Sequence, residues 1–293
     1  MSAVYEPSVS VIVPAYNTEG TIEECVRSLL ALRYPREKIE LRVVDNDSSD
    51  GTAEALSRYQ DRLVLVRERT RGAAAARNAG LAGAEGEVVA FTDADCVVDP
   101  DWLRHLVVPL RDPDVGIAGG TILARQPANY IERFGEAIHD HRKSIEVFRP
   151  PYAITMNWAS RREVLLQVGG FDERFRRCQD VDLSYRVIQS GYTLAFAPEA
   201  VTRHRNEQSL AGLFREGFVH GFYSVQARKR HWGFLRQFGS GRVDRRAYAN
   251  IVSRARDWGC GRDTPRSGCD AVFNSGKKAG KLLGSLRFGR LDL

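Results

Sequence analysis

The first 92 residues alternate short apolar runs with segments of helical periodicity, and this alternation constrains the fold more than any other feature. The apolar runs, which predict strands, are Val9–Val13, Leu41–Val44, Leu63–Val66 and Val88–Thr92. Strands that are apolar throughout and alternate with helices are typical of a parallel sheet covered on both faces. The sequence therefore predicts an α/β fold in which ligands bind beyond the carboxyl ends of the strands.

The rest of the chain predicts less regular elements. Strands are expected at 115–119 and 193–197, and helices at 130–148, 161–168, 180–189 and 209–232. Beyond residue 232, Gly, Arg and Ser become frequent and the periodicity fades.

Composition excludes several classes of protein. With 43% hydrophobic and 27% charged residues, the 293-residue chain is neither disordered nor fibrous. No apolar run approaches the roughly 20 residues of a membrane-spanning helix, and the polar N-terminus predicts no secretory signal. Five scattered cysteines without a C-x-x-C pair favour a reducing, cytoplasmic setting, although Cys260 and Cys269 could pair or share a metal.

Charge is unevenly distributed along the chain. Residues 205–293 hold 18 Lys and Arg against seven Asp and Glu, whereas residues 1–204 hold 25 against 30. A basic C-terminal region could contact an anionic membrane surface at the inner face of the membrane, a phosphorylated acceptor or nucleic acid. A solvated helical face is the alternative, and without a nucleic-acid-binding motif no nucleic acid is expected.

Two carboxylates, Asp93 and Asp95, follow the fourth predicted strand. In an extended segment both would point to the same side, and a divalent cation would relieve their repulsion. Carboxylates at helix starts can instead be caps, which is the interpretation we give to Asp50 and Asp99. The chain has neither a G-x-G-x-x-G after a predicted strand nor a G-x-x-x-x-G-K-[ST] segment. Neither a dinucleotide-binding Rossmann site nor a P-loop is therefore supported.

Six segments together resemble family 2 glycosyltransferases across about residues 8–205. They are Val9–Asn17, Val44–Thr52, Ala76–Gly80, Asp93–Asp95, Gly169–Asp172 and Gln179–Leu183. The resemblance implies a GT-A fold and nucleotide-diphosphate-sugar donors. It places a glycosyltransferase domain at 1–205, with a nucleotide-binding half at about 8–100 and an acceptor half at about 101–205. Residues 206–293 would form a basic, mainly helical extension.

The resemblance also assigns residues to the donor side. The turn after the first strand would line the base pocket, Asp45 would accept the imide hydrogen of a uracil, and Asp93 would contact the ribose. Arg77 would neutralise phosphate or support Asp93. The complete donor set is Pro14, Ala15, Tyr16, Asn17, Asp45, Arg77, Asp93 and Ala94. Tyr16 could instead be a packed rim residue, and Arg77 a salt-bridge partner of a neighbouring acid.

Asp95 and His204 would hold a Mn²⁺ or Mg²⁺ ion. Asp180 matches the usual catalytic base, although Gln179 replaces the Glu that normally precedes it. The acceptor-side residues would be Asn157, Trp158 and Asp182. His204 could be an ordinary surface residue, Trp158 a core residue, and Asp182 a helix-start charge or a partner that orients the site.

The predicted activity is transfer of a sugar, with inversion at the anomeric carbon, to a hydroxyl of a saccharide, lipid-linked or small-molecule acceptor. UDP is the expected donor nucleotide, with GDP and dTDP as alternatives. Two other functions stay open: a sugar-1-phosphate nucleotidyltransferase and a non-catalytic carbohydrate- or partner-binding relative.

Overall fold

The computed structural model describes residues 5–239, 245–260 and 265–291, and its contacts divide the chain into two compact units. The first comprises the chain through Arg125 together with His139–His204, and the second comprises Gln126–Ile138 together with the chain from Arg205. The sequence offered no signal that would group 126–138 with the C-terminal region, and the boundary near residue 205 stays a prediction. In the described ranges no helix is both long and apolar enough to cross a membrane.

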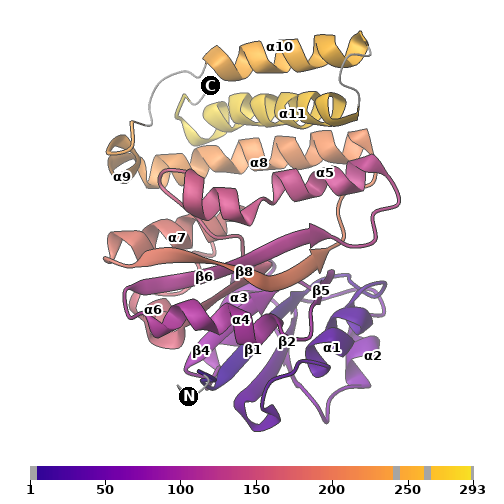
Figure 1. Cartoon of the computed structure of the whole chain (residues 1–293), viewed down its shortest axis with the longest axis vertical. Helices are drawn as coiled ribbons and strands as arrows, with labels where there is room; N and C mark the ends of the chain where they lie inside the picture. The colour runs from indigo at the N-terminus through magenta and orange to yellow at the C-terminus, as the bar shows by residue number, and fades with distance from the viewer. Residues whose placement is uncertain (1–4, 240–244, 261–264, 292–293) are drawn as a thin grey trace. The chain divides into compact units, whose positions relative to one another are not determined.

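An eight-stranded sheet forms the first unit, with strand order β3-β2-β1-β4-β7-β6-β8-β5 (Figure 1). The strands are β1 (Val9–Ala15), β2 (Ile39–Asp45), β3 (Val64–Arg67), β4 (Val88–Thr92), β5 (Cys96–Val98), β6 (Val115–Ala124), β7 (Asn157–Arg161) and β8 (Thr193–His204). β1 pairs in parallel with β2 and β4, and β2 pairs in parallel with β3. β7 runs antiparallel to β4 and β6, and β5 runs antiparallel to β8. The predicted α/β fold with a mainly parallel sheet is confirmed.

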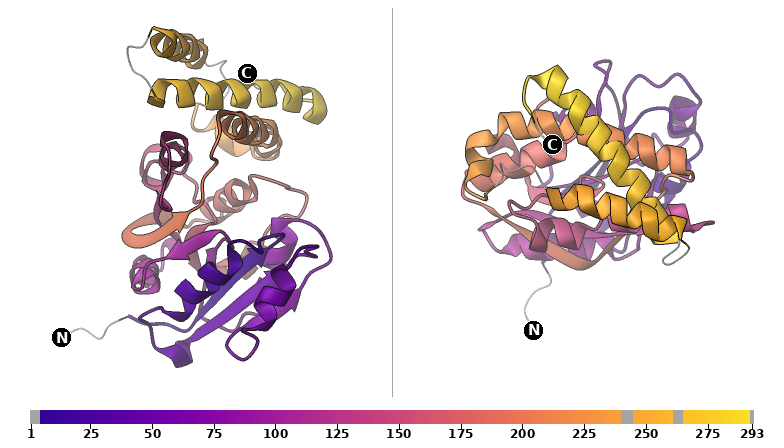
Figure 2. Two further views of the ribbon diagram at one scale, coloured as in Figure 1. Left: turned by 90° about the vertical axis from the view of Figure 1, so that its right-hand side faces the viewer. Right: turned by 90° about the horizontal axis from the view of Figure 1, so that it is seen from above.

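Helices cover both faces of this sheet (Figures 1 and 2). They and the shorter turns of helix are α1 (Ile22–Leu30), η1 (Arg36–Lys38), α2 (Thr52–Ser57), α3 (Ala73–Ala82), α4 (Trp102–Val107), η2 (Val108–Arg111), η3 (Lys143–Val147), α6 (Arg162–Gln167) and α7 (Gln179–Gln189). Successive strand residues point to opposite faces. Val11 and Val13 therefore pack with α1, α2 and α4, whereas Ile12 packs with α3, α6 and α7.

The helix expected at 130–148 is interrupted. Its first part ends at Ile138 and a short π-helical segment, η3, follows. Between them His141 is buried; its Nδ1 lies 2.9 Å from the Gly120 carbonyl oxygen, and its Nε2 accepts the Ile154 N–H at 2.9 Å. Burial lowers the pKa of His141 to about 3, so the ring is neutral. At this interruption of the helix, the imidazole of His141 connects β6 to the segment before β7 through these two contacts.

The second unit is helical, as the sequence predicts for the C-terminal extension. It contains α5 (Tyr130–Ile138), α8 (Leu210–Arg230), α9 (Trp232–Arg236), α10 (Arg245–Gly259) and α11 (Pro265–Phe288). α8 and α11 run parallel in close contact: a Cβ on Gly221 would lie 2.0 Å from the Lys277 carbonyl oxygen, and one on Gly280 would lie 2.0 Å from that of Phe218. Glycine at these positions lets the two backbones approach. Cys260 and Cys269 are both free, so the pairing considered for them is not formed.

Candidate active site

The turns that follow β1 and β2 are joined by hydrogen bonds. Asn17, in the left-handed region at φ 51°, donates its N–H to Ser48 Oγ at 3.1 Å and accepts the Ser49 N–H at 2.9 Å. Tyr16 is 44% exposed, and the Arg71 guanidinium lies 4.9 Å from the centre of its ring. Pro14 and Ala15 belong to β1 itself, beside Val44 and Asp45 of β2. The predicted base-pocket residues therefore share one edge of the sheet.

Asp45 is 5% exposed at the end of β2, where its Oδ1 accepts the Ser48 N–H at 3.2 Å. The next residue, Asn46, has a role that the sequence interpretation missed. Its side-chain amide donates to the carbonyl oxygens of Glu68 and Thr70, and its Oδ1 accepts the Gly72 N–H at 2.8 Å. Asn46 thereby fixes the loop that leads into α3.

Asp93, Ala94 and Asp95 do not continue the strand, which corrects the reasoning from alternation. β4 ends at Thr92, and the three residues form a tight turn in which the Cys96 N–H donates to the Asp93 carbonyl oxygen at 3.0 Å. The two carboxylates also have separate side-chain partners. Arg77 Nη2 lies 2.7 Å from Asp93 Oδ1, and His204 Nε2 lies 3.4 Å from Asp95 Oδ2. Each carboxylate therefore has its own contact in the structure, and a cation bound near Asp95 stays a prediction.

Arg77 is 3% exposed in α3, and among the described residues its Nε and Nη1 have no hydrogen-bond partner. Its guanidinium also lies 5.7 Å from the centre of the Phe171 ring. Buried N–H groups without partners are rare because each forfeits its hydration. A buried cation with donors to spare, next to Asp93, is suited to binding an anionic ligand.

Asp95 and His204 form the candidate metal centre. His204 ends β8 opposite Cys96 of β5, which brings it to the turn that carries Asp95. Burial opposes ionisation of Asp95, but the contacts with His204, the backbone and Cys96 together outweigh it and hold the pKa of Asp95 below its usual value. Among the described residues no three His, Cys, Asp or Glu side chains form a metal cluster. One carboxylate and one imidazole fit a cation whose remaining ligands come from substrate phosphates and water.

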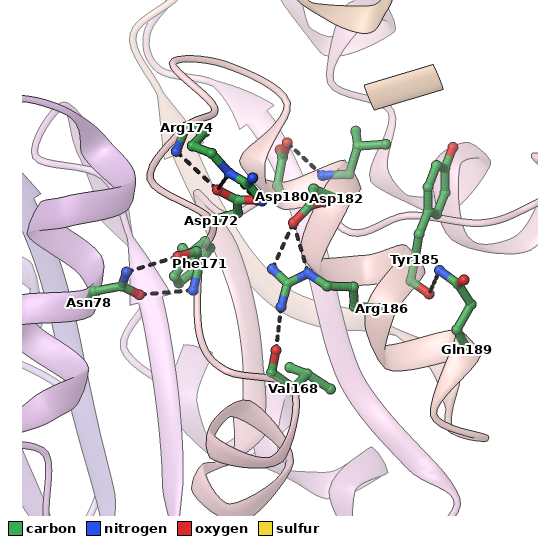
Figure 3. Close-up of polar contacts among 11 residues, drawn as sticks. Asn78, Val168, Phe171, Asp172, Arg174, Asp180, Asp182, Tyr185, Arg186 and Gln189 are labelled. Carbon is green, nitrogen blue, oxygen red and sulfur yellow. Dashed lines mark hydrogen bonds and ion pairs between the residues drawn. The ribbon is translucent and has the colours of Figure 1, made fainter. Parts of the chain in front are cut away.

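Asn78, the residue after Arg77, holds the loop between α6 and α7 against α3 (Figure 3). Its Oδ1 accepts the Phe171 N–H at 2.8 Å, and its amide nitrogen donates to the Phe171 carbonyl oxygen at 2.9 Å. Gly169 and Gly170, both at positive φ, give the loop its path. Neighbouring residues of α3 thus fix Asp93 and the loop that leads to Asp180.

Asp180 lies in the first turn of α7 and is partly buried (Figure 3). Burial raises its pKa, with a smaller contribution in the same direction from Asp93; the Val181 N–H, at 2.9 Å, and the Arg77 charge oppose the rise. Among the described residues no salt bridge to Asp180 is formed. Burial also raises the pKa of Tyr152, and the charge of Asp180 adds to that rise. Tyr152 therefore lies near the carboxylate, although the sequence interpretation gave it no role.

Asp182, one residue beyond Val181, has a different environment. It is fully buried, and its Oδ2 accepts hydrogen bonds from Arg186 Nε at 2.9 Å and Nη2 at 2.7 Å (Figure 3). Arg186 Nη1 continues to the Val168 carbonyl oxygen at 2.5 Å. These contacts support a role in orienting α7, and direct contact of Asp182 with an acceptor stays a prediction.

Asn157 and Trp158 lie in β7 and are 0% and 1% exposed. The Asn157 amide nitrogen donates to the carbonyl oxygens of Thr121 and Ala200, and its Oδ1 accepts from Trp102 Nε1 at 2.8 Å. Trp158 packs against Phe91, with ring centres 5.0 Å apart. Their acceptor-side role stays a prediction, and their burial indicates that it would be indirect.

Polar and charged side chains thus gather at the ends of β1, β2 and β4, within electrostatic range of the start of α7. The family model for glycosyl transferase family 2 matches residues 10–169. Glycosyltransferase AglE of Haloferax volcanii is 31% identical over 204 residues, which cover 68% of this chain and 67% of that protein. The chain belongs to glycosyl transferase family 2 and is a glycosyltransferase.

Other relatives show how far the likeness extends. The probable glycosyltransferase YdaM of Bacillus subtilis is 27% identical over a match that covers 72% of this chain and 53% of YdaM. Among solved structures, the mannosyltransferase PcManGT of Pyrobaculum calidifontis, in complex with GDP-Man and Mn²⁺, superposes with a TM-score of 0.64. It is 26% identical, and the match covers 98% of this chain and 77% of that one. S. aureus TarS, at 18% identity and a TM-score of 0.57, shares the GT-A fold alone.

Proposed function

We propose that this enzyme transfers a sugar from a nucleoside-diphosphate sugar to an acceptor hydroxyl, with inversion and with Asp180 as general base. The observation that carries the proposal is the environment of Asp180. Its carboxyl group has a raised pKa, makes no salt bridge among the described residues, and lies within electrostatic range of Arg77 and Asp93. A carboxylate that is more basic than usual is suited to removing a proton from a hydroxyl group.

Donor binding in this proposal uses the edge of the sheet. Tyr16 and Asp45 would contact the base, Asp93 the ribose, and Arg77 the diphosphate through its unpartnered N–H groups. UDP-sugars are the first donors to test. GDP-sugars come next because PcManGT, whose structure contains GDP-Man and Mn²⁺, is similar over nearly the whole chain.

Asp95 and His204 are the proposed holders of a Mn²⁺ or Mg²⁺ ion. Bound there, the ion would stabilise the negative charge that develops on the leaving diphosphate. Arg77 would donate hydrogen bonds to the same group, while Asp93 keeps its guanidinium in place. Asp180 would accept the proton of the acceptor hydroxyl as that oxygen attacks the anomeric carbon from the face opposite the diphosphate. One displacement with one base inverts the configuration.

The test is the release of nucleoside diphosphate from a panel of UDP-, GDP- and dTDP-sugars, with Mn²⁺, with Mg²⁺ and with chelator. We expect one nucleotide class to be favoured and chelator to suppress turnover. Proton NMR of the freshly formed product should show an anomeric configuration opposite to that of the donor sugar. Retained configuration would refute the single-displacement mechanism.

One additional assay, with a nucleoside triphosphate and a sugar 1-phosphate, and a binding measurement with nucleotide sugars separate the two alternatives. A sugar-1-phosphate nucleotidyltransferase would release pyrophosphate from a nucleoside triphosphate and a sugar 1-phosphate. A non-catalytic relative would bind a nucleotide sugar without turnover. No observation in the structure favours either over glycosyl transfer.

A further inference from the structure

The second unit has one end at which cationic and apolar side chains are exposed together. α8 and α11 run parallel, so their C-terminal ends lie at the same end of this unit, next to α9 (Figure 1). Lys229 Nζ donates to the Phe288 carbonyl oxygen at 2.7 Å, and the Arg290 guanidinium lies 3.4 Å from the centre of the Trp232 ring. We call this region, residues 226–239 and 278–291, the basic end.

The basic end contains Lys and Arg side chains but no acidic side chains to balance their charge. Residues 226–239 and 278–291 contain eight Lys and Arg and no Asp or Glu. The acids that the structure describes in this unit lie in α5, in or just before the first two turns of α8, or where α10 meets the start of α11. Cations at helix C-termini complement the helix dipole, and this can account for several of them.

The helix dipole does not account for the apolar side chains at the same place. Leu286 is 76% exposed, Leu291 73%, Leu282 51%, Leu283 49% and Phe238 38%. Among them lie the exposed cations Lys229, Arg230, Arg236 and Arg287. Clustered exposed apolar residues mark an interaction surface rather than an ordinary solvated face.

Exposed cations and exposed apolar side chains together fit one kind of partner. Two copies of the chain meeting at this end would bring like charges together, which disfavours self-association. Nucleic acid would satisfy the cations but leave the leucines against phosphates. An anionic bilayer satisfies both, because its headgroups attract Lys and Arg while leucine side chains enter the boundary between headgroups and acyl chains.

We propose that the basic end is a docking surface for an anionic lipid membrane, on which the second unit lies without crossing it. The surface lies wholly within the second unit, so the proposal stands or falls independently of the proposed chemistry of the first.

Co-sedimentation of the full chain with lipid vesicles tests the proposal. We expect binding to vesicles of phosphatidylcholine with 30% phosphatidylglycerol at 50 mM salt. Binding should be at least tenfold weaker to pure phosphatidylcholine, and salt at 500 mM should abolish it. Equal binding to both vesicle types, or no binding to either, would overturn the proposal.

Matched variants locate the surface. Arg236→Ser combined with Arg287→Ser should weaken binding about 25-fold, since each cation near an anionic surface contributes about fivefold. Arg215→Ser removes an exposed cation, 3.2 Å from Glu207, from the other end of α8 and should leave binding unchanged. If the double variant bound like the parent chain, or if Arg215→Ser weakened binding equally, charge at the basic end would not be responsible.

Leu286→Ser should weaken binding about tenfold, whereas Leu166→Ser, at a leucine 51% exposed in α6, should not. Leu286→Trp provides a readout of position: brominated lipid should quench its added fluorescence but not that of Leu166→Trp. Both sites are exposed, so thermal melts should be nearly unchanged and loss of folding is separable from loss of binding. Reversible dimerisation that Leu286→Ser abolishes, without vesicle binding, would show that a second copy covers the surface and would refute the membrane proposal.

Discussion

The turn after β4 and the first turn of α7 both place aspartates at the candidate active site, but the two regions give these aspartates opposite electrostatic environments. In the turn, Asp93 has Arg77 at 2.7 Å and Asp95 has His204 at 3.4 Å. The pKa of Asp95 is held below its usual value. At the start of α7, burial raises the pKa of Asp180.

The difference separates two chemical tasks. A carboxylate that binds a cation or a sugar hydroxyl must stay ionised, and a hydrogen-bonding partner for its charged form favours this. A carboxylate that removes a proton works better when it is basic, and desolvation without a direct salt bridge achieves this. Environments that move two acids in opposite directions are typical of sites in which the acids have different roles. The turn after β4 therefore fits donor binding, and the start of α7 fits proton transfer.

The largest expected effect comes from Asp180→Asn, which keeps the shape of the side chain and removes its basicity. We predict a fall in turnover of at least about 10²-fold, the range typical of lost acid–base catalysis. Donor affinity should be nearly unchanged. Initial rate, donor affinity by calorimetry and melting temperature are measured on one preparation. Near-normal turnover would remove Asp180 from the mechanism.

Asp182→Asn is the matched control two residues along the same helix, and it should show the reverse pattern. Asp182 is fully buried and holds Arg186, so the substitution leaves part of a buried ion pair without its partner. Disrupting such a pair costs about 3 kcal/mol of unfolding free energy. Denaturant unfolding should show this loss, while turnover per folded molecule is largely retained. A loss of turnover equal to that of Asp180→Asn would instead support a direct role for Asp182 in the reaction.

Asp95→Asn should have a smaller effect, confined to the affinity for ligands that carry the diphosphate group. The Asn oxygen is a weaker cation ligand than a carboxylate, so we expect affinity for the nucleotide sugar with Mn²⁺ to fall about tenfold. Affinity for the nucleoside, which lacks phosphate, should hardly change. Calorimetry with both ligands, with and without the cation, makes the comparison. Equal and cation-independent affinities in the parent chain and the variant would argue against a metal at Asp95 and His204.

The parallel half of the sheet could be predicted because β1 and β4 are buried on both faces and apolar at most positions, and because β2 contains the buried apolar residues Leu41, Val43 and Val44. β7 escaped prediction because Asn157 and Ser160 interrupt its apolar pattern. These polar side chains are compatible with burial only through partners distant in sequence, such as Thr121 and Trp102 for Asn157. Local patterns do not contain that information.

Within the candidate site, the residue types could be predicted but not their contacts. The alternation argument placed Asp93 and Asp95 together because it extended the strand past Thr92, where the chain in fact turns. The clamping roles of Asn46 and Asn78 were missed, although both lie in segments that carry the family resemblance. Apart from the Glu173 carboxylate, which also accepts from Asn78, their partners are backbone groups of other loops, which no spacing rule identifies. An Asn in a motif, beside residues already assigned to chemistry, is the signal that could have indicated them.

The smallest expected effect is on pH dependence, and it follows from the raised pKa of Asp180. The base acts only when ionised, so turnover at saturating substrate should fall as pH decreases through that pKa. The acidic limb of the pH–rate profile should therefore lie above 3.8, the ordinary value for Asp.

The stability of the fold should change with pH in the opposite direction. A carboxyl whose pKa is higher in the folded state favours folding below its unfolded pKa, and that contribution is lost as pH rises through the folded pKa. Asp180→Asn should thus gain in unfolding free energy relative to the parent chain as pH rises across that interval, and then keep a constant difference. Urea unfolding of both proteins at several pH values measures this difference. A difference that does not change with pH would mean that Asp180 titrates alike in the folded and unfolded chain, and the contrast between the two regions would then rest on Asp95 alone.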